Sequence, residues 1–169
     1  LQIASNRGRM GGKPYTSGAI TTENKYSFLY GDVEISAHLP RGQGMWPAFW
    51  MLTADANHKV DIMEMVSDPN RVYQTYHENI PTYNSYQYQC MVQETYLASA
   101  FHLYSLVWSA TTITWYIDGA QTCQITKNVP HTPMYLLLDT AVGGAWPGTP
   151  NATTVFPQYT SIDYARIYQ

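Results

Sequence analysis

Short runs of strand-forming residues, each closed by a glycine or proline turn, recur along the chain and constrain its fold most strongly. The clearest run is 112–117, rich in Ile, Trp and Tyr, which Asp118-Gly119 joins to Gln121–Thr126. Asp-Gly between two such runs is typical of a two-residue β-hairpin turn, because these residues tolerate the positive φ angles that the turn requires. The pattern predicts an antiparallel all-β fold, either a sandwich or a jelly roll.

The same pattern predicts further strands and few other elements. Strands are expected at 26–38 (interrupted near Gly31), 46–52, 59–66, 71–77, 102–108, 134–142 and 160–168. Tyr76–Tyr96, polar and rich in tyrosine, is interpreted as a long loop over one edge of a cleft. Val92–Tyr104 has apolar residues at helical spacing but no clear caps, so no long helix is expected.

Length and composition favour one secreted domain. With 169 residues and 45% hydrophobic content, residues 1–169 are expected to form a single domain. Only 12% of residues are charged, while Tyr numbers 15 and Trp 5. Such a surface suits neutral polysaccharide, although a β-rich secreted domain of any function has similar composition. A net charge of −3 argues against nucleic acid as a partner, and neither a membrane span nor a leader is expected from the sequence.

Two further features leave alternatives open. Cys90 and Cys123 are the only cysteines, and they form either one disulfide or two buried free thiols. Asn151-Ala-Thr153 matches a glycosylation acceptor pattern, which arises often by chance.

The stretch KVDIMEM, residues 59–65, gathers three ionisable groups within one predicted strand. Side chains alternate along a strand, so Lys59 and Asp61 share one face and Glu64 falls on the other. A β-bulge at Met63 would return Glu64 to the face of Lys59 and Asp61, and bulges are common beside active sites. Retaining glycosidases use two carboxyl groups roughly 5–5.5 Å apart in such a cleft.

KVDIMEM resembles the E-x-D-x-x-E signature of glycoside hydrolase family 16, in its laminarinase-like branch. The likeness continues in order through Tyr15–Leu52, VYQTYHE, FHLYSLVWSATTITWYIDG, AVGGAWPG and IDYARIYQ. The resemblance implies a jelly-roll sandwich with a concave glycan-binding cleft and retaining endo-hydrolysis of β-1,3-glucan. It also implies that the front of the family's domain is absent, as in an unusually short member or an excised fragment.

The resemblance assigns roles within the motif. Glu64 matches the general acid/base, and Asp61 matches the aspartate that tunes the proton affinities of its neighbours. Lys59 stands where the family has its nucleophilic Glu, and an ammonium group cannot form the glycosyl ester of the two-step mechanism. Its charge is also expected to lower the pKa of Glu64. Catalysis is therefore expected to be weak or lost, with an inverting route through Asp61 as a minor alternative.

Four more residues match the family's substrate-binding positions. The spacing between Trp46 and Trp50 is even, so in a strand both side chains lie on one face, where they are predicted to stack on sugar rings. His77 follows the next strand, and Trp146 lies in a glycine-rich loop at the cleft rim. Packing in the core is the competing interpretation for one of the tryptophans, and a structural role for His77. The tryptophans at 108 and 115 are interpreted as core or convex-face residues.

Some positions depart from the family. Ala19 and Ser36 stand where Arg is common, and Ala145 where Asn is common, which removes sugar-binding donors. Asp163 resembles a calcium ligand whose partners lie in the absent front, so no cofactor is expected and a structural calcium stays open. Two other functions remain: a non-catalytic carbohydrate-binding module, and an assembly protein that self-associates through exposed edge strands.

Overall fold

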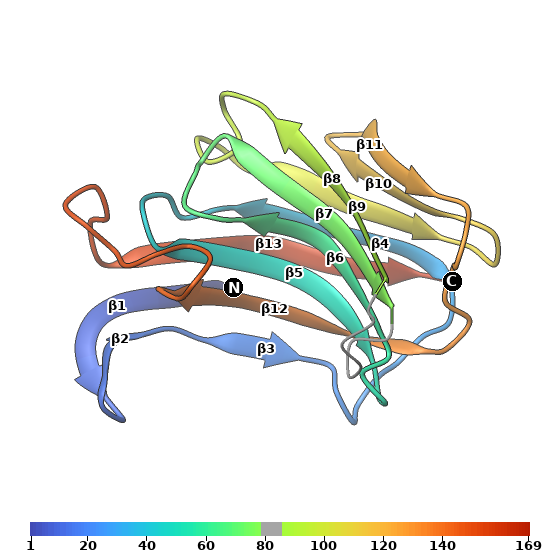
Figure 1. Ribbon diagram of the computed structural model, residues 1–169, viewed down its shortest axis with the longest axis horizontal. Helices are drawn as coiled ribbons and strands as arrows, with labels where there is room; N and C mark the ends of the chain where they lie inside the picture. The colour runs from blue at the N-terminus through green and yellow to red at the C-terminus, as the bar shows by residue number, and fades with distance from the viewer. Residues whose placement is uncertain (79–85) are drawn as a thin grey trace.

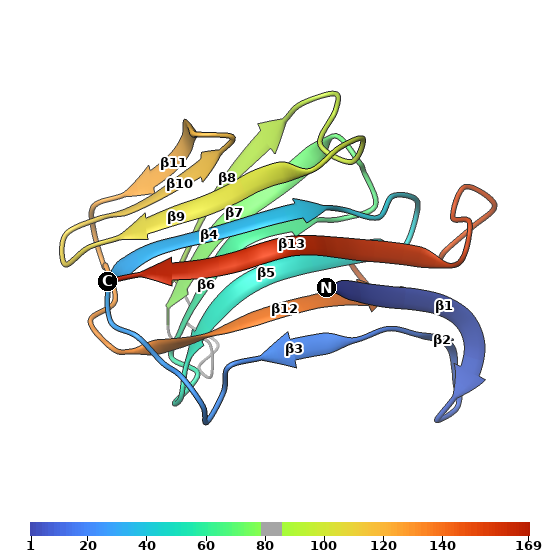
Figure 2. The same ribbon diagram turned by 180° about the vertical axis from the view of Figure 1, so that it is seen from behind.

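The structure is a computed structural model that describes residues 1–78 and 86–169, and it consists of two stacked antiparallel sheets (Figures 1 and 2). The described ranges contain strands and no helix. The strands are β1 (Gln2–Met10), β2 (Lys13–Thr16), β3 (Ala19–Thr21), β4 (Gly31–His38), β5 (Met45–Thr53), β6 (His58–Met65), β7 (Arg71–Glu78), β8 (Tyr86–Gln93), β9 (His102–Trp108), β10 (Ile113–Ile117), β11 (Ala120–Ile125), β12 (Met134–Val142) and β13 (Gln158–Tyr168).

The two sheets have different roles. The cleft sheet has the order β3-β12-β5-β6-β7-β8, and the outer sheet has the order β11-β10-β9-β4-β13-β1-β2. Figure 1 views the molecule from the side of the cleft sheet, and Figure 2 from the side of the outer sheet. Neighbouring strands that are distant in sequence, such as β4 and β13, give the crossovers of a jelly roll, so the predicted fold class is confirmed.

Alternating apolar residues of both sheets meet in one core. Val33 and Ile35 of β4 are fully buried, as are Phe49 and Met51 of β5. This period of two is what a strand requires when only one of its faces is covered. The tryptophans at 108 and 115 are also buried, which selects the core interpretation for both.

A buried hydrogen bond joins the two sheets at the motif strand. Trp115 of β10 donates its Nε1–H to the backbone oxygen of Asp61 in β6, at 2.9 Å. The indole therefore spans the core and satisfies a backbone acceptor beside the bulge, where ladder bonding is interrupted.

The sequence predicted most strands correctly, but it did not predict β2, β3 or β8. The hairpin at Asp118-Gly119 is confirmed, and β5, β6, β7, β9, β12 and β13 begin and end within two residues of the predicted limits. In the range 26–38, only Gly31–His38 forms a strand, because positive φ angles at Tyr30 and Gly31 break the extended backbone before it. Val92–Tyr104 holds no helix; it ends β8, turns, and begins β9.

The expected long loop at 76–96 is wrong over most of the residues that are described. β7 continues to Glu78, and Tyr86–Gln93 forms β8, which pairs with β7 along its whole length. Most of β8 is exposed on both faces, because it lies at the sheet edge, so it lacks the apolar alternation that identifies a half-buried strand. Residues 79–85 of the expected loop lie outside the described residues.

Cys90 and Cys123 form a disulfide with an S–S distance of 2.02 Å. The bond links β8 of the cleft sheet to β11 of the outer sheet and so ties two edge strands together. This settles the two alternatives that the cysteine count left open. Pairing of a second chain with exposed strand edges stays a prediction.

Across the described residues, the structure has no helix long and apolar enough to cross a membrane.

Candidate functional site

The register of β6 changes between Asp61 and Glu64, as a β-bulge requires. Asp61 lies opposite Trp50 of β5, and Met63 lies opposite Phe49, so one residue of β6 has no partner. On the β5 side the extra residue is Ile62, and on the β7 side neither Ile62 nor Met63 has a partner, so the bulge includes the Met63 that the sequence analysis expected. An additional residue reverses the alternation of side chains. It places Glu64 on the same face as Asp61.

Three charged side chains of β6 meet on that face. Lys59 Nζ lies 2.7 Å from Asp61 Oδ1 and 4.0 Å from Glu64 Oε1. His77 of β7 completes the cluster, with its Nε2 3.0 Å from Asp61 Oδ2 and the carboxylate as acceptor. Asp61 is fully buried and Glu64 is 3% exposed, so these groups interact with little screening by water. Lys59 also lies over the ring of Trp50, 5.0 Å from its centroid.

Glu64 has a raised pKa in spite of the lysine beside it. Burial is the largest cause, and the negative charge of Asp61 adds to it; together they raise the pKa of Glu64 to about 7. The charge of Lys59 and the hydrogen bond from Trp46 act in the opposite direction and are outweighed. The expected direction of the Lys59 effect is confirmed, since its charge lowers the pKa of Glu64, but burial and the charge of Asp61 outweigh it.

Lys59 itself stays an ammonium group. Burial lowers its pKa, but the charges of Asp61 and Glu64 outweigh burial and raise the pKa above the ordinary value. The site thus holds a cation next to Asp61 and next to a Glu64 carboxyl group that is protonated below about pH 7.

Aromatic side chains form one wall of the cleft. Trp46 donates its Nε1–H to Glu64 Oε1 at 3.1 Å. Its ring meets that of Trp146 edge to face, with centroids 5.2 Å apart, and the centroid of the Tyr73 ring lies 5.1 Å from that of Trp146. Trp146 is 45% exposed, which leaves much of its ring for a ligand.

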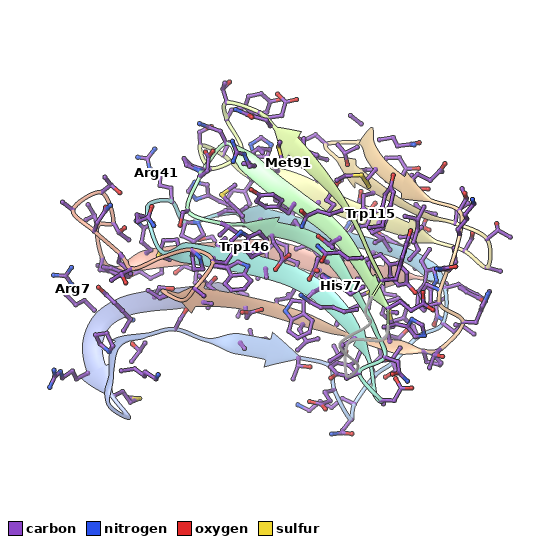
Figure 3. The ribbon with its side chains drawn as sticks, in the orientation of Figure 1. Arg7, Arg41, His77, Met91, Trp115 and Trp146 are labelled. Atoms are coloured by element: carbon purple, nitrogen blue, oxygen red, sulfur yellow. A yellow bond between two sulfur atoms is a disulfide. The ribbon has the colours of Figure 1, made fainter. Side chains whose placement is uncertain are left out.

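The cleft contains two adjoining cavities. The larger, of about 480 Å³, is lined by Trp46, Lys59, Glu64, His77, Gln87, Gln89 and Trp146. Figure 3 shows His77 and Trp146 in front of the cleft sheet. The smaller, of about 180 Å³, shares three of these residues and extends toward Trp50, Asp139 and two alanines. Asp61 lines neither cavity and lies beneath Lys59 and His77.

The sequence analysis missed several residues of the cleft. Asp139 of β12 accepts a hydrogen bond from Trp50 Nε1 at 2.7 Å, and burial raises its pKa. One signal could have found it, namely a single carboxylate within the apolar run 134–142. Gln87 and Gln89 were missed because β8 was interpreted as a loop. Tyr73 gave no signal, since it is one of many tyrosines.

The positions that depart from the family pattern lie in different places. Ala19 of β3 pairs with Asp139, so it borders the cleft, and Ala145 is exposed beside Trp146. Ser36 is on β4 of the outer sheet, and the buried neighbours on either side of it direct it away from the cleft. Ser36 therefore cannot contact a ligand in the cleft, which corrects the role given to this position.

Asp163, the position that resembles a calcium ligand, is exposed on β13. Among the described residues, no group of three or more His, Cys, Asp or Glu side chains could hold a metal ion.

The chain is similar to proteins that act on β-glucans. The family profile "Glycosyl hydrolases family 16" matches residues 2–166. An endo-1,3-1,4-beta-glycanase, ExsH of Rhizobium meliloti, is 38% identical over 162 residues, covering 93% of this chain and 34% of that protein. Glucan endo-1,3-beta-glucosidase A1 of Niallia circulans is 35% identical, covering 92% of this chain and 26% of that protein. The chain thus spans about a third or less of the length of these curated relatives.

Solved structures agree with this similarity. The laminarinase catalytic domain of Thermotoga maritima superposes with a TM-score of 0.89 at 34% identity, covering 99% of this chain and 76% of that one. The endo-beta-1,3-glucanase of Pyrococcus furiosus has a TM-score of 0.88 at 30% identity, covering 99% of this chain and 74% of that one.

Proposed function

This chain belongs to glycosyl hydrolase family 16, and from that premise we propose that it binds β-1,3-glucan in its cleft and hydrolyses it weakly or not at all. One observation carries the proposal: Lys59, at the position where the family pattern has a nucleophilic Glu, forms a charge contact with Asp61 at 2.7 Å.

Binding is supported by the aromatic and amide groups of the cleft. Trp46 and Trp146 offer rings at the wall of a cavity of about 480 Å³, a size typical of ligand sites. Gln87 and Gln89 add amide donors and acceptors on the opposite edge of this cavity. Rings that stack on sugar faces, combined with amides that bond hydroxyl groups, suit an uncharged polysaccharide.

Loss of hydrolysis follows from the chemistry of Lys59. A retaining glycosidase forms a glycosyl ester between a carboxylate and the anomeric carbon, and water then breaks that ester. An ammonium group has no lone pair for the attack, and Asp61 is buried beneath Lys59 and His77. Glu64, with a pKa of about 7, could still protonate a leaving glycosidic oxygen. Of the two carboxyl groups that the mechanism needs, the acid/base is therefore present and the nucleophile is missing.

Parallel binding and hydrolysis assays on laminarin test the proposal. Quenching of tryptophan fluorescence reports binding, and release of reducing sugar reports hydrolysis. We expect saturable quenching with little or no sugar release. Sugar release at the rate of an ordinary glucanase would contradict the loss of catalysis, while no binding would favour a purely structural role for the sandwich.

We also propose that the protein works outside the cytoplasm and needs no cofactor. The disulfide supports the location, because such bonds persist in oxidising compartments. The cleft supplies its own proton donor in Glu64.

A further inference from the structure

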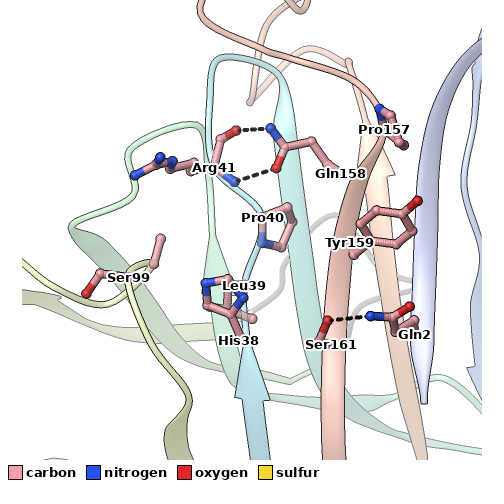
Figure 4. A pocket seen from close by; sticks show the side chains of 11 residues that line it. Gln2, His38, Leu39, Pro40, Arg41, Ser99, Pro157, Gln158, Tyr159 and Ser161 are labelled. Carbon is pink, nitrogen blue, oxygen red and sulfur yellow. Dashed lines mark hydrogen bonds between the residues drawn. The ribbon is translucent and has the colours of Figure 1, made fainter.

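A second cavity, of about 450 Å³, opens on the outer sheet (Figure 4). It lies between the start of β1, the end of β4, the turn at 96–99 and the start of β13. It shares no lining residue with the two cavities of the cleft, yet it is almost as large as the first of them. The fold therefore has a second concave site that the cleft does not account for.

Tyr159 gives this outer cavity an open aromatic ring. Its side chain is 43% exposed, and its partner in register on β1 is Ala4. Residues directly opposite on paired strands share a face, so the small side chain of Ala4 is the direct neighbour of Tyr159 on β1. At the end of β4, His38 lies 5.9 Å from the ring of Phe101, which is 53% exposed. Phe101 does not itself line the outer cavity, so Tyr159 supplies the exposed aromatic ring of its wall.

Uncharged polar groups stand beside Tyr159. Gln2 donates from Nε2 to Ser161 Oγ at 3.3 Å, which leaves Gln2 Oε1 and the hydroxyl hydrogen of Ser161 for a ligand. Ser161 pairs in register with His38, so the imidazole lies next to it. Within the described ranges, no hydrogen bond engages Gln2 Oε1 or the His38 ring.

The charges that line the outer cavity favour a neutral ligand over an anionic one. Among the described residues, no carboxylate lines the outer cavity, and the guanidinium group of Arg41 is directed away from Tyr159 (Figure 4). Rings together with amide, hydroxyl and imidazole groups match the faces and hydroxyls of a neutral sugar. An anionic ligand would lack a cation near the ring.

Hydrogen bonds and prolines restrain one part of the outer cavity. The amide of Gln158 accepts a bond from the backbone N–H of Arg41 at 3.3 Å and donates to its carbonyl at 3.0 Å. Pro40 and Pro157 fix the backbone on either side. A preformed site loses little conformational entropy when a ligand enters.

We propose that the outer cavity is a second binding site for neutral glucan, with Tyr159 as its stacking ring. The choice of glucan rests on the proposed function of the cleft. Two sites on opposite faces of one domain allow the protein to bind two polysaccharide chains of an insoluble glucan at once. Such bivalent binding increases avidity without new contacts at either site.

Amide chemical-shift titration with laminarihexaose tests each site separately. We expect saturable shifts at the amides of Gln2, Gln158 and Ser161 in addition to those of the cleft. Tyr159→Ala should raise the Kd measured at these outer amides at least about fivefold, since a lost stacking ring costs on the order of 1 kcal/mol. The Kd at the cleft amides should not change.

Tyr168→Ala is the matched control, because Tyr168 is on the same strand, is 47% exposed and does not line the outer cavity. Its spectrum should titrate like that of the parent. Absence of saturable shifts at the outer amides, or shifts that Tyr159→Ala leaves unchanged, would overturn the proposal. Shifts at the outer amides without any at the cleft would support it and contradict the proposed function of the cleft.

Discussion

Glu64→Gln should make the protein less sensitive to pH, because the buried carboxyl group holds its proton more tightly in the folded state than in the unfolded state. Its pKa is raised from 4.5 to about 7, chiefly by burial and then by the charge of Asp61. Since one pKa unit corresponds to about 1.4 kcal/mol, this difference amounts to about 3 kcal/mol. Glutamine fills nearly the same volume and keeps an oxygen that can accept the Trp46 hydrogen bond.

The direction of the effect follows from proton linkage. A group whose pKa is raised on folding contributes stability that is complete below the unfolded value of 4.5 and is lost as the pH rises through about 7. The free energy of unfolding of the parent should therefore fall, relative to Glu64→Gln, by about 3 kcal/mol between pH 4.5 and 8.

Urea unfolding followed by tryptophan fluorescence, repeated across this pH range, measures the difference. Glu94→Gln is the control, since it removes an exposed carboxylate from the loop after β8. That variant should follow the pH profile of the parent. Parallel profiles for the parent and Glu64→Gln would refute the reasoning, because they would show that Glu64 has no raised pKa.

Three further changes have expected outcomes. Trp46→Ala should weaken laminarin binding about fivefold or more in a fluorescence titration, from loss of a stacking ring worth on the order of 1 kcal/mol; unchanged affinity would assign Trp46 to packing alone. Replacing Cys90 and Cys123 together by Ser should lower the free energy of unfolding by about 3 to 4 kcal/mol, because the disulfide closes a loop with a sequence separation of 33. An equal urea midpoint with and without the bond would contradict this. Gly31→Ala should lower the thermal midpoint far more than Gly119→Ala, since both have positive φ but only at Gly31 would the added methyl group meet a backbone carbonyl of β13. Equal effects in calorimetry would count against that crowding.

The sequence predicted the fold well where local signals were strong. Asp118-Gly119 fixes a hairpin by turn chemistry alone, and apolar runs such as 134–142 identify central strands. β8 was missed for a physical reason: an edge strand exposed on both faces has no apolar period, and its partner strand and the Cys90–Cys123 bond hold it in place. Those contacts are long-range and leave no local pattern.

The sequence indicated which charged residues meet in the candidate site, but it did not indicate the pKa of Glu64. The spacing of Lys59, Asp61 and Glu64 indicated that a bulge must bring them together, and the register shift does so. Alternation alone could not say whether Ile62 or Met63 is the extra residue, because both are apolar and buried. The pKa of Glu64 depends on its burial in the folded protein. Asp139 reaches the cleft through the pairing of β12 with β5. Neither the burial of Glu64 nor the position of Asp139 can be derived from the motif.

Hydrolysis of laminarin by Lys59→Glu tests the central claim most directly, namely that Lys59 blocks a cleft that is otherwise built for retaining hydrolysis. The variant should release reducing sugar at least about a thousandfold faster than the parent, because a restored nucleophile supplies most of the acceleration in a covalent mechanism. Adding Glu64→Gln in that background should remove about 10²–10⁴ of the gain, the usual contribution of a general acid/base. A folded Lys59→Glu protein that binds laminarin and stays as inert as the parent would contradict the claim.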